Sequence, residues 1–64
     1  MMLGFVKKWD QSKGWGFIED EEGYDYFFNI LNVRKGTKVK EGLNVKFDVF
    51  ESSRGQEAEN ISIV

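Results

Sequence analysis

The stretch KGWGFIED, residues 13–20, places two aromatic side chains between glycines. Successive side chains of a β-strand point to opposite faces, so Trp15 and Phe17 share a face with a lysine and a glutamate. The opposite face carries only Ile18 and two glycines, of which one is Gly16. A core on the aromatic side would bury two charges, whereas glycines on the core side let another backbone segment approach closely. We therefore predict that the aromatic face of this strand points outward.

The next strand, predicted over residues 24–29, repeats this arrangement. Asp25, Phe27 and Asn29 alternate with apolar residues and are expected to point outward. The face predicted to belong to the core carries Tyr26, Phe28 and Ile30. A register error of one residue would exchange the two faces, so a buried Phe27 is the alternative.

Turn signals divide the rest of the chain into further short strands. We predict strands over residues 3–10, 14–19, 24–29, 44–51 and 57–63, with at most one short helical turn in residues 30–42. A single domain over residues 1–64, all-β and built as a small five-stranded antiparallel barrel, accommodates this order and leaves no free sheet edge.

The composition excludes several classes of function. The 64 residues contain no cysteine and no histidine, so disulfides and the usual zinc ligands are absent. No nucleophile–base pair is recognisable, and we expect no enzymatic activity, no cofactor and no small-molecule substrate. The chain shows neither an apolar run of membrane-spanning length nor a secretory signal, and we predict a cytoplasmic protein without membrane contact.

Charges are clustered along the chain, although the net charge is only -2. Residues 19–25 include five acidic and no basic residues, and residues 34–40 include four basic and no acidic residues. The acidic turn lacks the alternating ligand spacing of a calcium loop, so we predict a solvated turn. For the basic loop, simple solvation and phosphate contact remain equal alternatives.

Pairing of the first three strands predicts a surface cluster of aromatic and basic side chains. Its members are Trp9, Trp15, Phe17 and Phe27, edged by Lys7, Lys13 and Lys8. A bulge at the Lys7–Lys8 step is the alternative, and it would make Trp9 a core or rim residue. Aromatic rings stack on bases and lysines meet phosphates, which favours single-stranded nucleic acid as the partner. Asn29 and Asp25 are candidates for base-edge hydrogen bonds.

KGWGFIED followed by DYFFNI (25–30) resembles the two short ribonucleoprotein-type motifs of the cold-shock domain family. The flanking segments GFVKKWD (4–10), EGLNVKFDV (41–49) and RGQEAENI (54–61) resemble comparable segments of that family. The larger RNA-recognition motif uses similar letters, but it needs two helices and a longer chain. The resemblance implies a barrel of the oligonucleotide/oligosaccharide-binding (OB) type that binds single-stranded RNA and DNA.

The resemblance also implies site residues, position by position. They are Lys7, Trp9, Lys13, Trp15, Phe17, Asp25, Phe27, Asn29 and Arg54, with Lys8, Ile30 and Lys38 as further candidate contacts. The chain departs from the family pattern at several of these positions. Lys8 stands where the family usually has tryptophan, Asn29 where it has histidine, and Ile30 where it has an exposed phenylalanine. Weaker base stacking and a steeper salt dependence are expected.

Two classes of function remain open from sequence. The first is a nucleic-acid-binding protein of low sequence specificity, acting as an RNA chaperone, antiterminator or stress-related regulator. The second is a protein-interaction or self-associating barrel that uses the same aromatic patch, with strand exchange as one route. We expect a monomer, with a strand-exchanged dimer as the alternative.

Overall fold

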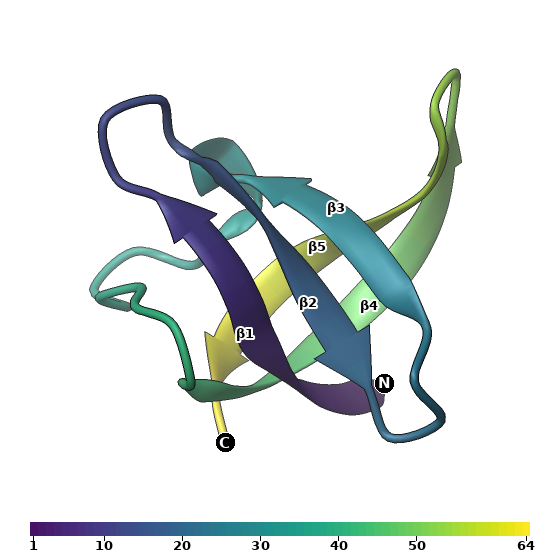
Figure 1. Ribbon diagram of the computed structural model, residues 1–64, viewed down its shortest axis with the longest axis horizontal. Helices are drawn as coiled ribbons and strands as arrows, with labels where there is room; N and C mark the ends of the chain where they lie inside the picture. The colour runs from purple at the N-terminus through teal and green to yellow at the C-terminus, as the bar shows by residue number, and fades with distance from the viewer.

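The computed structural model describes all 64 residues as a closed barrel of five strands (Figure 1). These are β1 (Met2–Asp10), β2 (Trp15–Asp20), β3 (Asp25–Asn29), β4 (Asn44–Ser52) and β5 (Gly55–Ile63). Around the barrel the order is β1-β2-β3-β5-β4. Strands β3 and β5 pair in parallel, and the other neighbours pair antiparallel. The predicted all-β barrel is confirmed, and the parallel seam is the one pairing that the antiparallel prediction did not include.

One short 3₁₀ helix, η1 (Ile30–Asn32), follows β3 and is the only helical segment. It accounts for the single helical turn predicted in residues 30–42. No helix in the structure is long and apolar enough to cross a membrane.

The core confirms the alternation predicted for β2, β3 and β4. Eight hydrophobic side chains are buried: Val6, Ile18, Tyr26, Phe28, Val45, Phe47, Ala58 and Ile61. Phe27, between two of them, is only half-buried. The prediction that Ile30 faces the core is wrong, because its side chain is 46% exposed. The chain leaves the strand at Asn29 and enters η1, where the period of two no longer holds.

Strand β1 contains a bulge between Val6 and Lys8. Val6 pairs with Ile18 in the core, but the next pair joins Lys8 to Phe17, so one extra residue lies in β1. The extra residue reverses the parity of the rest of β1. Lys8 consequently shares the outer face with Phe17, and the prediction that Trp9 lies on that face is wrong. The alternative of a bulge at this step, with Trp9 packed against the core, is confirmed.

Gly16 allows β1 and β2 to approach each other closely. Its position is buried, and a Cβ atom there would overlap the backbone carbonyl oxygen of Lys8. The same Cβ atom would lie 3.1 Å from the Phe28 ring. Gly14 is the other glycine predicted on the core side of the strand, but it ends the β1–β2 turn with φ +73° and the strand begins after it. Close backbone packing thus explains Gly16, whereas turn geometry explains Gly14.

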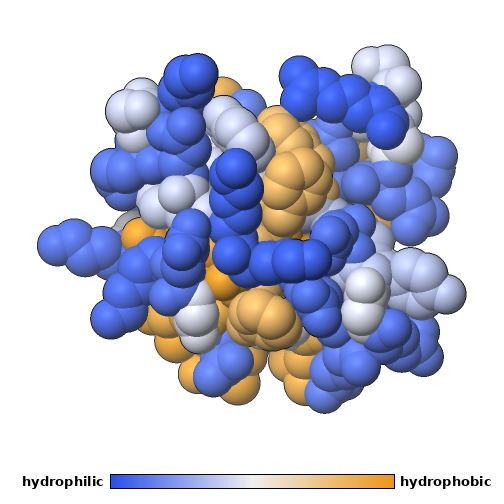
Figure 2. Space-filling model, in the orientation of Figure 1, coloured by the Kyte–Doolittle hydropathy of each residue, from blue (hydrophilic) through white to orange (hydrophobic).

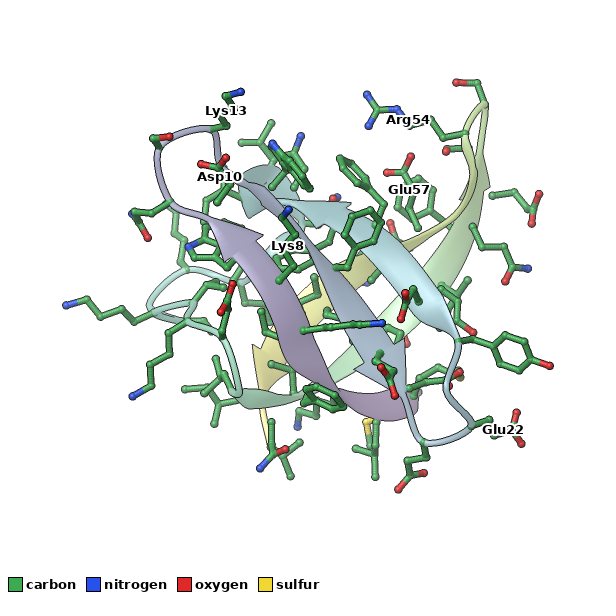
Figure 3. All side chains as sticks on the ribbon, viewed as in Figure 1. Lys8, Asp10, Lys13, Glu22, Arg54 and Glu57 are labelled. Carbon is green, nitrogen blue, oxygen red and sulfur yellow. The ribbon has the colours of Figure 1, made fainter.

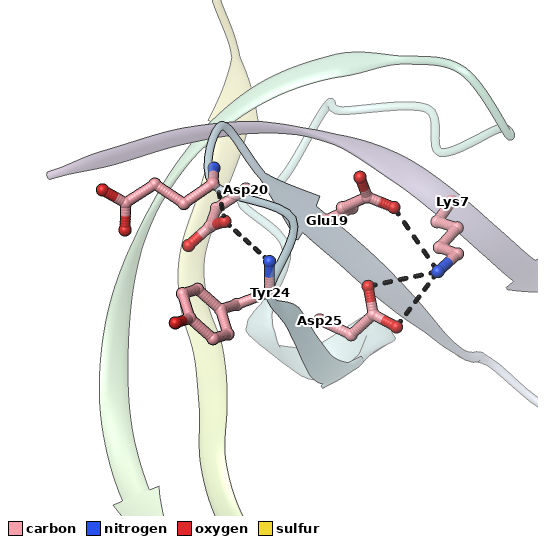
Figure 4. Close-up of polar contacts among 6 residues, drawn as sticks. Lys7, Glu19, Asp20, Tyr24 and Asp25 are labelled. Carbon is pink, nitrogen blue, oxygen red and sulfur yellow. Dashed lines mark hydrogen bonds and ion pairs between the residues drawn. The ribbon is translucent and has the colours of Figure 1, made fainter.

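The β2–β3 turn is organised by a buried carboxylate. Asp20 is only 6% exposed and accepts hydrogen bonds from the backbone N–H groups of Glu22 and Tyr24, each at 2.9 Å (Figure 4). The Tyr26 hydroxyl donates to its other oxygen at 3.1 Å. Burial alone would raise the pKa of Asp20, but these hydrogen bonds outweigh burial and hold it below the ordinary value of 3.8. The prediction of a wholly solvated acidic turn is therefore wrong at Asp20.

Substitution of Gly16 by alanine should strongly destabilise the barrel. The added methyl group meets backbone rather than a mobile side-chain end, so we expect a loss of about 3 kcal/mol, the upper part of the overpacking range. Urea unfolding followed by circular dichroism measures the change. Lys46→Met on the exposed side of β4 is the control and should stay within about 0.5 kcal/mol of the parent protein. Equal stability of the two variants would contradict the close β1–β2 approach.

Asp20 should make the barrel sensitive to acid. A carboxyl group whose pKa is lower in the folded than in the unfolded state stabilises the fold above its unfolded pKa. That stabilisation is lost as the pH falls below about 4 and through the folded-state pKa. Asp20→Asn should be less stable at pH 7 and should lose less further stability between pH 5 and pH 2.5 than the parent protein. If the urea midpoints of the two proteins fall by the same amount across this pH range, Asp20 is not the source of the acid sensitivity.

Candidate nucleic-acid interface

Three aromatic rings from β2 and β3 form one cluster on the outer face of the barrel. Phe17 pairs directly with Phe27 across the strands, and Trp15 is the next outward residue of β2. The Trp15 and Phe27 rings stack with centres 6.0 Å apart and an interplanar angle of 22°. Phe17 meets both of them edge-on, with each pair of centres 5.8 Å apart. These three rings are called the platform below.

Two cations lie over the platform. The Lys8 ammonium is 5.4 Å from the centre of the Trp15 ring, and the Arg54 guanidinium carbon is 4.6 Å from the centre of the Phe27 ring. Lys8 comes from β1, and Arg54 comes from the turn between β4 and β5, so the cations reach the rings from opposite sides (Figure 3). The bulge in β1 places Lys8 on this outer face. Without the bulge, the alternation of the strand would place Lys7 and Trp9 there and turn Lys8 inward.

Lys13 is a third cation at the same end of the barrel. It is exposed in the β1–β2 turn and points away from the barrel (Figure 3). Asp10 stabilises this turn by accepting hydrogen bonds from the Ser12 hydroxyl at 2.9 Å and from the Lys13 N–H at 3.0 Å. These hydrogen bonds lower the pKa of Asp10, the one from Ser12 most. The turn therefore presents Lys13 next to the start of β2.

A groove runs over the platform, and Figure 2 shows an apolar surface there enclosed by hydrophilic side chains. Its lining includes six predicted site residues: Lys13, Trp15, Phe17, Phe27, Asn29 and Arg54. An adjoining groove shares Phe17, Phe27 and Arg54 and extends to Tyr24 and Gln56. Sequence reasoning missed these last two residues. The only signal for Tyr24, which is 64% exposed, was its place directly after the turn glycine.

Lys7 and Asp25 form an ion pair. The Lys7 ammonium lies 3.1 Å from Asp25 Oδ2 and 3.4 Å from Glu19 Oε1, so it bridges two carboxylates beside the acidic turn (Figure 4). Hydrogen bonds to Asp25 and then to Glu19 raise the pKa of Lys7 above its ordinary 10.5. Lys7 is exposed but is not a free cation, in contrast to Lys8, Lys13 and Arg54.

Asn29 has both a structural role and a free donor. Its Oδ1 accepts a hydrogen bond from the Leu31 N–H at 2.8 Å, and its own N–H donates to Asn32 Oδ1 at 3.0 Å. This reciprocal pair caps η1. The Asn29 Nδ2 group has no partner and lies at the groove. Because the cap uses the Asn29 acceptor, the Nδ2 donor is the group of Asn29 that remains for the predicted hydrogen bond to a base edge.

The remaining predicted residues lie outside the platform. The Trp9 ring stacks on the core residue Phe28 with centres 5.4 Å apart, and its Nε1–H donates to Gln11 at 2.9 Å. Ile30 is exposed beside the Lys13 turn, where its N–H donates to the Gly14 carbonyl. Lys38 is exposed in the loop between η1 and β4 and contributes to neither groove.

Comparison with known proteins agrees with this geometry. The family model "'Cold-shock' DNA-binding domain" matches residues 2–64. The chain is 40% identical over 62 residues to a cold shock-like protein CspC of Bacillus cereus, covering 94% of this chain and 95% of the relative. It is 41% identical over 64 residues to the major cold shock protein of Streptococcus pyogenes serotype M1, covering 97% and 96%.

A more distant match is the cold shock-like protein of Thermotoga maritima, which is 35% identical over 65 residues and is covered to 98%. The family match spans nearly the whole chain, and the barrel presents its aromatic and cationic residues on one face. The chain therefore belongs to the cold-shock domain family of nucleic-acid-binding proteins.

Proposed function

We propose that the protein binds single-stranded RNA and DNA with low sequence specificity. The observation that carries the proposal is the platform of Trp15, Phe17 and Phe27 on one outer face of the barrel. Every base has a π-face, so stacking on such rings tolerates different sequences. Bases in a duplex are already stacked on their neighbours and cannot occupy these rings.

Phosphate contacts come from the cations around the platform. Lys8, Lys13 and Arg54 have no carboxylate within ion-pair distance, since both ion pairs in the structure involve Lys7. The acidic turn lies at the other end of β2 and β3, where it repels a phosphate chain. A bound strand is therefore expected over the rings at the Lys13 and Arg54 end.

Selective binding to unpaired strands gives the activity of an RNA chaperone. A ligand that binds only the open form of a hairpin shifts the equilibrium toward that form by mass action. Weak hairpins, including those that terminate transcription, are the RNA structures that such binding opens. Antitermination and regulation under stress are thus consequences that we propose for the same activity, exerted by a monomer in the cytoplasm.

The direct test is a titration with single-stranded oligomers. Oligo-dT or oligo-rU should quench tryptophan fluorescence at low salt, and the affinity should fall as salt rises. Static light scattering on the same samples distinguishes a monomer from a self-associating barrel. Unchanged fluorescence with both oligomers at low salt would refute the proposal. Concentration-dependent dimers that bury the platform would favour the protein-interaction alternative.

Phe17→Ala and Phe27→Ala should each weaken oligo-dT binding by about 1–3 kcal/mol, because each variant removes one stacking ring. Both variants should still unfold cooperatively in urea, since neither ring belongs to the buried core. Phe5→Ala is the matched control, because Phe5 is an exposed ring on β1 outside the platform. A loss of binding in all three variants, or in none, would show that the platform is not the contact surface.

Asp25→Asn should strengthen oligo-dT binding at low salt and make its salt dependence steeper. The substitution removes the closer of the two carboxylates that hold Lys7 and leaves only Glu19 at 3.4 Å, so the ammonium moves more readily to a phosphate. One added phosphate contact increases the slope of log K against log salt by about 0.7 for single strands. Asp48→Asn on the exposed side of β4 is the control for loss of one negative charge. Weaker binding by Asp25→Asn at every salt concentration would instead assign Asp25 a direct hydrogen bond to a base.

A further inference from the structure

In the free protein a cation lies over two of the three platform rings. Lys8 lies over Trp15 and Arg54 lies over Phe27, as described above. Neither cation has a carboxylate within ion-pair distance, and each makes a cation–π contact with a platform ring instead. Figure 3 shows Lys8 on the β1 side of the β2–β3 pair and Arg54 on the side of the β4–β5 turn.

The spacing of the rings restricts where a base can stack. Trp15 and Phe27 are nearly parallel with centres only 6.0 Å apart. A base between them would require about 7 Å, because each stacking step takes about 3.4 Å. A base must therefore stack on a face of one ring at a time rather than between Trp15 and Phe27. Each of these two rings already has a cation over one face, Lys8 over Trp15 and Arg54 over Phe27.

We infer that Lys8 and Arg54 are specificity-determining residues, which make the platform select bases attached to a phosphate chain over neutral aromatic ligands. A base that stacks on the face of Trp15 under Lys8 must displace the ammonium, and the same holds for Phe27 and Arg54. A nucleic-acid strand offers each displaced cation a phosphate close to the stacked base. A neutral ligand offers no such replacement, so it bears the whole cost of the lost cation–π contact.

Lys7 shows why it matters whether a cation is held by a carboxylate or by a ring. Its ammonium is held by Glu19 and Asp25 and is 3.1 Å from the nearer carboxylate oxygen. Moving Lys7 to a phosphate would break ion pairs, whereas moving Lys8 breaks only a contact with a ring. The exchange from ring to phosphate is thus available to Lys8 and Arg54 and disfavoured for Lys7. This inference rests on the proposed nucleic-acid binding.

The test compares two ligands that differ only in backbone charge, a thymine tetramer with phosphodiester links and one with uncharged methylphosphonate links. Binding is followed by the ¹H–¹⁵N signal of the Trp15 indole. Lys8→Met should bind the uncharged tetramer about two- to fivefold more tightly than the parent protein. The same variant should bind the charged tetramer more weakly at low salt, with a salt slope reduced by about 0.7.

The opposite effects of Lys8→Met on the two tetramers distinguish the exchange of Lys8 from ring to phosphate from simpler roles. An unchanged affinity for the uncharged tetramer would mean that Lys8 does not compete for the ring. Tighter binding of both tetramers would mean that Lys8 only obstructs the ring, and either result overturns the inference. Lys46→Met, on the exposed side of β4, should leave the affinity for the uncharged tetramer as in the parent protein. If the parent protein fails to bind the charged tetramer at low salt, the proposed function itself is wrong.

Discussion

One extra residue in β1, between the Val6–Ile18 and Lys8–Phe17 pairs, decides which side chains of that strand face the core. Without it, Lys8 would point inward like the core residue Val6. A lysine would then have to be buried, or the barrel could not close. With it, Trp9 covers Phe28 and the Lys8 ammonium reaches Trp15. Core packing and the composition of the outer face are thus two results of one backbone feature.

The bulge depends in turn on the close approach of β1 and β2. The absent side chain of Gly16 leaves the space into which the Lys8 carbonyl fits. On the other side of β2, Phe17 pairs with Phe27, so the strands that glycine brings together are also the strands that present the platform. The KGWGFIED stretch therefore contributes a close-packed inner face and an aromatic outer face through the same alternation.

The distribution of charge matters more than the net charge of -2. At one end of β2 and β3, Asp20 is buried under hydrogen bonds, while Lys7 bridges Glu19 and Asp25. Lys8 and Arg54 instead lie over the Trp15 and Phe27 rings and form no ion pair. Three carboxylates at the acidic end thus have partners within the protein, whereas the two cations over the platform have no carboxylate within ion-pair distance and remain available to a partner. A polyanion can bind a protein of negative net charge when the unpaired cations lie together on one face.

Sequence reasoning predicted the strands and the outward direction of Trp15, Phe17 and Phe27, because a period of two needs no tertiary information. It placed Trp9 on the wrong face, since a bulge has no side-chain signature and the parity count continued through it. It also treated Asp20 as solvated, because acidic residues in a turn look alike until Tyr24 and Tyr26 are folded around one of them. The cation–ring contacts were beyond reach for the same reason, since they join β1 and the β4–β5 turn to the rings.

Amide chemical shifts, recorded residue by residue while oligo-dT is added, test the central claim most directly. The account predicts that the perturbed signals cluster at Lys8, Trp15, Phe17, Phe27 and Arg54, which come from β1, β2, β3 and the β4–β5 turn. Signals of the exposed β4 residues Lys46 and Asp48 should not move. Perturbations that centre on β4, or that spare β2 and β3, would contradict the assignment of the platform as the nucleic-acid surface.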